Sequence, residues 1–288
     1  MSGAVLLPSP SVRFAPDFLA RLGRLTAQAR GLRERREGAG RARLLGVGSE
    51  FVGHRPYRSG EDLRALDWSL LARLGRPYVR VSAREASEAW ALFVDASASM
   101  GTGRPGKLQL AAECATALAA LAVERRASAT LYLSNEEEPL RITRRTELAR
   151  LMARLEGARA GGERGLGALV AGPAARTRAG RWVFLGDFLD CSPGAILGLA
   201  RGARELVLGR ILAREEVAPP AAHAARWLDP ESGRERTLRL GPDGRARYEE
   251  RLERELETWA QAAARARALA GMWTSDAAFE DVAGELAA

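Results

Sequence analysis

A carboxylate and two hydroxyls follow one apolar run of the sequence at alternate positions, where they could share a cation. Asp95, Ser97 and Ser99 come directly after the run WALFV, and a second run, WVFLG, ends at Asp187. Such runs predict strands buried on both faces, and ligands bind where the carboxyl ends of parallel strands meet. Oxygen ligands of this kind suit Mg²⁺ or Mn²⁺. We therefore expect a metal site at the first three residues, with Asp187 acting through water. A helix-capping loop is the alternative, because Ser and Asp are common turn residues.

A glycine-rich stretch at residues 101–107 indicates a different chemistry, phosphate binding. It fits the pattern G-x-x-x-x-G-K, opens an expected helix and precedes WVFLGD, which fits a Walker B strand. Two features oppose this interpretation. Leu108 stands where Ser or Thr would hold Mg²⁺, and Pro105 interrupts glycines that begin six residues after Asp95. Nucleotide binding through Lys107 is thus the alternative function, and a linker before a helix is the simplest interpretation.

Nucleophilic catalysis has little support in the sequence. No G-x-S-x-G motif is present, and His54 and His223 lie in polar, loop-like surroundings. Cys114 lies among alanines of an expected helix, and Cys191 has no identifiable base nearby. Two cysteines are too few for a disulfide framework or a zinc site. We expect a protein that is not an enzyme.

Alternating apolar runs and amphipathic segments would position these residues. The last helix begins at Ala277, and a hairpin of residues 226–228 and 236–240 turns at Gly233. This alternation predicts an α/β fold with a doubly wound, mostly parallel sheet. The other expected strands cover residues 90–95, 129–133, 181–187, 205–212 and 272–274, and the other helices cover residues 107–125, 146–156, 193–201 and 243–270.

The N-terminal third is basic, with sixteen arginines and seven carboxylates between Met1 and Arg84. Residues 17–37 place Phe18 and Leu22 at helical spacing opposite a basic face, and residues 41–84 read as irregular, with strand-like pieces at RARLLGVG and PYVRVSARE. One lysine accompanies 43 arginines, which reflects base composition, and no aromatic residues interleave with the charges. We therefore expect surface arginines and ion pairs, and no nucleic-acid partner.

The DxSxS pattern resembles the metal-ion-dependent adhesion site of von Willebrand factor A domains. The stretches GSEF, RPYRSGED, RALDW and AR, from Gly48 to Arg73, resemble the signature of the bacterial family called domain of unknown function 58, with Glu61 where the family more often has Asp. GDFLD at residues 186–190, DPESG at 229–233 and residues 248–252 also fit, so the resemblance runs from about residue 40 to the end. A complete adhesion site takes a further Thr, but residues 161–166 hold neither Thr nor Ser, and Glu163 is the alternative ligand.

The signature residues form a second constellation. One interpretation is a docking face, because Tyr, Trp and Arg are common interface hot spots. The other is structural and is the one we favour: Asp62 and Asp67 pair with arginines, and Trp68 packs inward. The candidate partner-binding residues are Arg55, Tyr57, Arg58, Asp62, Arg64, Asp67, Trp68 and Arg73.

The resemblance implies a non-enzymatic adaptor that works beside a MoxR-type AAA+ ATPase. We expect three parts: an N-terminal extension (1–40), a small β-rich segment (41–87) and a von Willebrand factor A-like domain (88–288). No stretch approaches the roughly 18 apolar residues of a membrane span, and no basic residues precede the first apolar stretch, so we expect a cytoplasmic protein. Peripheral contact with anionic lipid stays open, as does a structural scaffold with a degenerate metal site.

Overall fold

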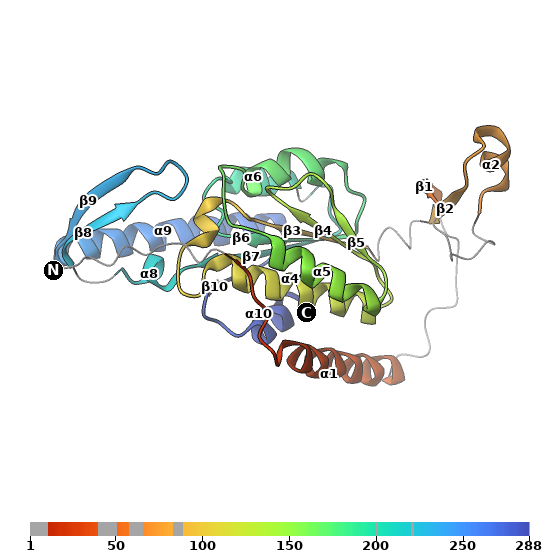
Figure 1. The fold of residues 1–288 in the computed structure, drawn as a ribbon, viewed down its shortest axis with the longest axis horizontal. Coiled ribbons are helices and arrows are strands. Elements are labelled where there is room, and N and C mark those ends of the chain that lie inside the picture. Colours follow the sequence, from red (N-terminus) through yellow and green to blue (C-terminus); the bar gives the residue numbers. More distant parts are fainter. Residues whose placement is uncertain are drawn as a thin grey trace.

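A six-stranded sheet forms the centre of the computed structural model, which describes residues 11–39, 51–57, 66–82, 89–199, 201–219 and 222–287 (Figure 1). The strand order is β10-β7-β6-β3-β4-β5; all neighbouring strands are parallel except β5, which is antiparallel to β4. The expected doubly wound α/β fold is therefore confirmed. The strands are β3 (Trp90–Val94), β4 (Ala129–Leu133), β5 (Leu140–Ile142), β6 (Arg181–Gly186), β7 (Glu205–Leu212) and β10 (Leu269–Thr274).

Helices cover both faces of this sheet, and each face has its own apolar core. Every residue of β3 and β6 is buried, which is why their sequences are apolar without alternation. Leu92 and Val94 face one core, whereas Ala91 and Phe93 face the other. The first core is covered by α1 (Phe18–Ala39), α4 (Lys107–Glu124), α5 (Leu148–Gly157) and α10 (Phe279–Ala287), and the second by α6 (Leu166–Leu169), η4 (Val170–Ala174), α7 (Pro193–Leu199) and α9 (Pro242–Ala266).

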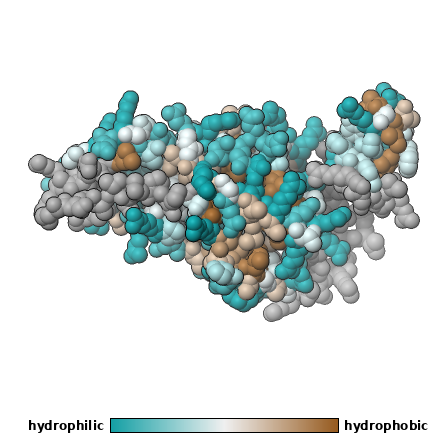
Figure 2. All heavy atoms as spheres, in the orientation of Figure 1, coloured by the Kyte–Doolittle hydropathy of each residue, from teal (hydrophilic) through white to brown (hydrophobic). Residues whose placement is uncertain are grey.

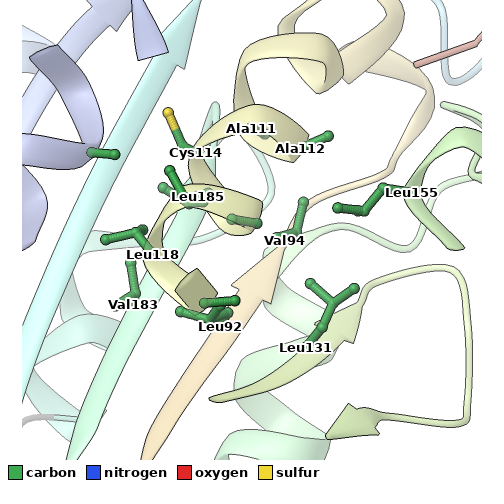
Figure 3. Close-up of a cluster of buried hydrophobic side chains, with 14 of the residues drawn as sticks. Leu92, Val94, Ala111, Ala112, Cys114, Leu118, Leu131, Leu155, Val183 and Leu185 are labelled. Carbon is green, nitrogen blue, oxygen red and sulfur yellow. The ribbon is translucent and has the colours of Figure 1, made fainter. Parts of the chain in front are cut away.

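Helix α4 is the most deeply buried helix of the first core. Its small side chains allow close approach to the sheet, and Cys114 lies among them (Figure 3). Burial raises the pKa of the Cys114 thiol well above its usual value, which fits the expected core role. Because α4 is fixed in this way, the position of its first residue, Lys107, is also fixed.

The basic N-terminal helix packs on the domain. Phe18 and Leu22 of α1 are buried in the first core. Arg21 makes a two-pronged ion pair with Glu280 of α10, at 2.5 Å for each contact, and Arg30 pairs with Glu124 of α4 at 2.6 Å. Arginines of this helix are thus paired with carboxylates, as the composition led us to expect.

Two small two-stranded sheets are separate from the central sheet. Strands β1 (Phe51–Pro56) and β2 (Tyr78–Ser82) form an antiparallel pair around α2 (Trp68–Leu74), and β8 (Ala222–Leu228) and β9 (Glu235–Leu240) form the expected hairpin. Helix α8 (Arg214–Val217) and the 3-10 turns η2 (Ala98–Gly101) and η3 (Arg145–Glu147) complete the described elements. The strand-like piece at residues 41–48 lies outside the described residues. Within the described part of the chain, no helix combines the length and apolarity needed to cross a membrane.

Candidate metal centre

Strands β3 and β6 lie side by side where the chain direction through the sheet changes. From β3 the chain passes to β4 on one side, and it later returns to β6 on the other side. The backbone N–H of Asp95 donates to the carbonyl of Leu185 at 2.9 Å, so the two strands end level with each other. Asp187 follows β6 at the same edge. This is the crevice in which ligands bind in open α/β sheets.

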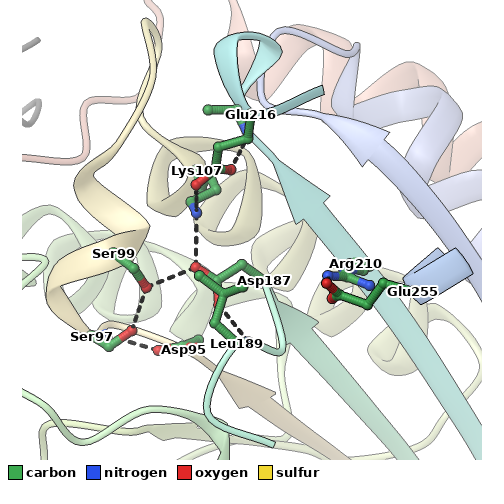
Figure 4. Close-up of polar contacts among 10 residues, drawn as sticks. Asp95, Ser97, Ser99, Lys107, Asp187, Leu189, Arg210, Glu216 and Glu255 are labelled. Carbon is green, nitrogen blue, oxygen red and sulfur yellow. Dashed lines mark hydrogen bonds and ion pairs between the residues drawn. The ribbon is translucent and has the colours of Figure 1, made fainter. Parts of the chain in front are cut away.

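Hydrogen bonds join the four predicted ligand residues into one buried cluster (Figure 4). The backbone N–H of Ser97 donates to Asp95 Oδ1 at 2.8 Å, and the hydroxyls of Ser97 and Ser99 lie 3.1 Å apart. Ser99 Oγ then donates to Asp187 Oδ2 at 2.7 Å. All four side chains are at most 4% exposed. The structure therefore brings together the residues that the sequence analysis selected.

Asp95 is the member of this cluster whose carboxylate lacks a hydrogen-bond partner on one oxygen. Its Oδ2 atom is buried and has no hydrogen-bond partner among the described residues. Burial, together with the nearby charge of Asp187, raises the pKa of Asp95 to about 7. Gly186 packs against this side chain, because a Cβ there would lie only 2.7 Å from Asp95 Cβ. A buried carboxylate oxygen without a donor needs a proton or a cation.

Lys107 joins the cluster from the start of α4, although the sequence analysis did not place it there. Its ammonium lies 2.8 Å from Asp187 Oδ2 and 2.7 Å from Glu216 Oε1, and the residue is fully buried. Glu216 Oε2 in turn accepts from the backbone N–H of Ala213 at 2.7 Å. The available signal was Lys107 itself, the only lysine of the sequence, but its pattern indicated a phosphate loop.

The loop at residues 161–166 runs beside the loop of residues 95–99, which we call the metal loop. Gly161 N donates to the carbonyl of Ala96 at 2.9 Å, and Ala98 N donates to the carbonyl of Gly162 at 3.0 Å. This loop brings no hydroxyl, and Glu163 is exposed. A cation between Asp95 and Asp187 would therefore receive its protein ligands from the carboxylates and the two serines.

Three further carboxylates, which we call the acidic rim, carry charges that act on one another and on Asp187: Glu163, Asp190 and Glu231. Asp190 accepts from the backbone N–H of Gly167 at 2.9 Å. Glu231 lies in the turn between β8 and β9. Its pKa is raised by burial and by nearby negative charges, among them those of Asp187, Asp190 and Glu163. The hairpin turn therefore places negative charge near the metal loop.

The donor set suits a hard cation. It consists of carboxylate and hydroxyl oxygens, which are the ligands that Mg²⁺ and Mn²⁺ take. Among the described residues, no group of three His, Cys, Asp or Glu side chains could hold a metal without other ligands. Asp95 Oδ2 is the one carboxylate oxygen of the cluster that has no hydrogen-bond partner among the described residues. A bound ion would thus depend on hydroxyls, waters and an outside ligand as well.

The described signature residues lie on the β1–α2–β2 segment, away from this cluster. Asp67 caps α2 by accepting from Leu70 N at 3.0 Å and pairs with His54 Nε2 at 2.8 Å, a contact that lowers the pKa of Asp67. We had expected an arginine partner for Asp67, so that prediction is corrected: the described partner is a histidine. Arg55 lies on β1, Tyr57 follows it and Arg73 is exposed in the last turn of α2, whereas Arg58, Asp62 and Arg64 lie outside the described residues.

Trp68 does not pack inward, contrary to the structural interpretation. Its side chain is 62% exposed, and Leu74 of the same helix is 56% exposed. None of the residues of α2 is buried, and Figure 2 shows apolar atoms over this helix. The apolar residues of α2 are thus not part of either core.

The comparisons with known proteins identify the family. The family described as "protein of unknown function DUF58" matches residues 53–258, which is more than half of the chain, so the protein belongs to that family. No curated protein shows a significant match to the sequence. Among solved structures, the chain is similar to the crystal structure of the conserved hypothetical protein BatB from Bacteroides thetaiotaomicron. That match has a TM-score of 0.41 and 13% identity, and it covers 69% of this chain and 97% of that one.

Proposed function

We propose that this protein is a non-enzymatic interaction module whose Mg²⁺ or Mn²⁺ site binds a partner protein through a carboxylate of the partner. Asp95, Ser97 and Ser99 would hold the ion, and Asp187 would act through water. The observation that carries the proposal is the buried Asp95 oxygen that has no partner among the described residues, at the edge where β3 and β6 end. The proposal follows the resemblance to an adhesion-type site of a von Willebrand factor A domain, without its further Thr.

The cluster supports binding better than catalysis. The hydroxyls of Ser97 and Ser99 are hydrogen-bonded to each other and to Asp187, and no histidine of the described residues contacts either serine. The serines therefore lack the adjacent histidine that commonly activates a serine nucleophile, and the Asp187 carboxylate that accepts from Ser99 is itself paired with Lys107. What the cluster offers is oxygen ligands on one side of a cation, with further positions left for water or a partner.

The acidic rim makes partner binding depend on the cation. Glu163, Asp190 and Glu231 would repel a carboxylate that approached the cluster alone. A divalent ion reverses the local charge and gives that carboxylate a ligand position. We therefore expect a partner with an acidic contact residue, bound only when the metal is present.

The family resemblance suggests a MoxR-type AAA+ ATPase as this partner and a cytoplasmic location. The exposed α2, with Trp68 and Arg73, is a second surface that such a partner could contact.

Neither alternative function gains a specific observation. Nucleotide binding would need Lys107 to reach a phosphate, but its ammonium is fully buried between two carboxylates. A scaffold with a degenerate site is the other alternative, and it predicts that partner binding survives Ser97→Ala and Ser99→Ala.

Calorimetric titration of Mg²⁺ and Mn²⁺ tests the metal site. We expect binding heats for the wild type and for Glu156→Ala, which removes an exposed carboxylate of α5, and no heats for Asp95→Ala. Equal, negligible heats in wild type and Asp95→Ala would contradict the metal site. Binding of a purified MoxR-type ATPase from the same host, with and without chelator, tests the partner; binding that ignores the chelator would contradict a metal-dependent contact.

A further inference from the structure

We infer that the ammonium of Lys107 is a built-in cation of the site. A divalent metal must bind beside this charge, so Lys107 lowers the affinity of the site for the metal. The inference rests on the proposed function, because it concerns the same cluster. Lys107 is the only lysine of the sequence, and it is fully buried between Asp187 and Glu216. Its charge is therefore a fixed part of the site.

Asp187 has more hydrogen-bond and charged partners than Asp95. Asp187 Oδ2 receives both the ammonium of Lys107 and the hydroxyl of Ser99, and Asp187 Oδ1 accepts from the backbone N–H of Leu189. Asp95 Oδ2 has no such partner among the described residues. The ammonium thus neutralises Asp187 and holds the cluster together without a metal, while Asp95 stays available to a second cation.

A divalent ion at Asp95 would lie beside this ammonium and would be repelled by it. Charges that share a buried site interact strongly because little water screens them. Glu216 offsets part of this repulsion by taking the other side of the ammonium, and it is fixed by the backbone N–H of Ala213 and by the Tyr248 hydroxyl, which donates to its carbonyl. Lys107 therefore weakens metal binding, and Glu216 limits the weakening.

Two substitutions with opposite expected effects test this role. Lys107→Met removes the ammonium and keeps a side chain of similar length, so Mn²⁺ should bind at least tenfold more tightly in calorimetry. Glu216→Gln keeps the ammonium and removes its second negative partner, so Mn²⁺ should bind several-fold more weakly. Arg210→Met is the matched control, because it removes another buried cation paired with a carboxylate, Glu255, outside the cluster (Figure 4).

Stability gives a second readout that needs no activity. At one Mn²⁺ concentration, the metal should stabilise the wild type against urea less than it stabilises Lys107→Met, because it binds the wild type more weakly. Lys107→Met should be stabilised by Mn²⁺ and lose that stabilisation with chelator. Arg210→Met should respond as the wild type does.

Labelling with ¹⁵N-lysine provides a direct probe, because a single lysine gives a single side-chain signal. Mn²⁺ is paramagnetic and should broaden this signal in the wild type but not in Asp95→Ala. A signal that stays sharp while calorimetry shows Mn²⁺ bound would place the metal elsewhere and overturn the inference.

The outcomes separate this inference from the proposed function. Binding to Lys107→Met alone would support the inference and contradict a metal site in the native protein. Equal or weaker binding to a folded Lys107→Met than to the wild type would overturn the inference and leave the proposed function standing. Binding to neither protein would overturn both. If Lys107→Met does not fold, unchanged or tighter binding to Glu216→Gln overturns the inference, and weaker binding supports it.

Discussion

Replacing Asp95 with Asn should stabilise the metal-free protein in a way that depends on pH. The pKa of Asp95 rises from an ordinary value of 3.8 to about 7 in the fold, so between these values the native state holds a proton that the unfolded state does not. The free energy of unfolding therefore falls as pH rises through this window, and the loss is complete above pH 7. At 1.36 kcal/mol for each unit of pKa, the full loss is about 4 kcal/mol, a large part of the 5–15 kcal/mol that stabilises a typical domain.

The assay is urea unfolding of both proteins at pH 5 and pH 8 in the presence of chelator. About 3 kcal/mol of the loss falls between these pH values, so the stability of Asp95→Asn relative to the wild type should rise by that amount. Any cost of the new amide is the same at both pH values and cancels. If the stabilities of Asp95→Asn and the wild type depend equally on pH, the pKa of Asp95 is not raised in the folded protein and the reasoning is refuted.

Three further outcomes follow from the same contacts. The affinity for the metal should rise about tenfold per pH unit up to about pH 7 and then level off, because the ion displaces the proton of Asp95. Calorimetry across pH 5.5–8.5 measures this affinity, and an affinity that does not change with pH would contradict the expectation. Gly186→Ala should destabilise the protein by about 1–3 kcal/mol in urea unfolding, because the new Cβ would meet Asp95, whereas Gly198→Ala, which has open space, should not. Phe18→Ala should cost about 3–5 kcal/mol, and Trp68→Ala less than about 0.5 kcal/mol, in the same assay; equal costs would place α1 outside the core.

The large elements of the fold could be predicted because the sheet is covered on both faces. Strands β3, β6 and β7 are apolar along nearly their whole length, so their bounds follow from composition. Strand β5 has only three residues and α8 only four, too few for any periodicity to show. Helix α2 could not be predicted for a different reason. None of its residues is buried, so its apolar residues do not form the one-sided stripe that indicates a helix packed on a core.

The clustering of the candidate ligands could be predicted because Asp95 and Asp187 each come directly after a strand end. Two strands that are parallel and adjacent must bring their next residues together, and this applies to Asp95 and Asp187. The position of Lys107 could not be predicted in this way. Its partner Asp187 is 80 residues away, and the ammonium reaches it because α4 packs on the face of β3 and β6. Local sequence around Lys107 instead matches a phosphate loop, which the tertiary contacts do not support.

The missing hydroxyl at residues 161–166 and the buried Lys107 should both lower the affinity of the site for a metal ion. At the proposed site a cation would lack one neutral ligand and lie beside an ammonium, so we expect it to bind weakly to this protein alone. A partner's carboxylate would supply both the missing ligand and a compensating charge, so metal and partner should raise each other's affinity by one common factor. We expect that factor to be tenfold or more in the wild type, smaller in Lys107→Met, where the ion already binds tightly, and absent in Asp95→Ala. Titrating Mn²⁺ with and without the purified ATPase measures it, and an undiminished factor in Asp95→Ala would show that the partner does not bind through the ion.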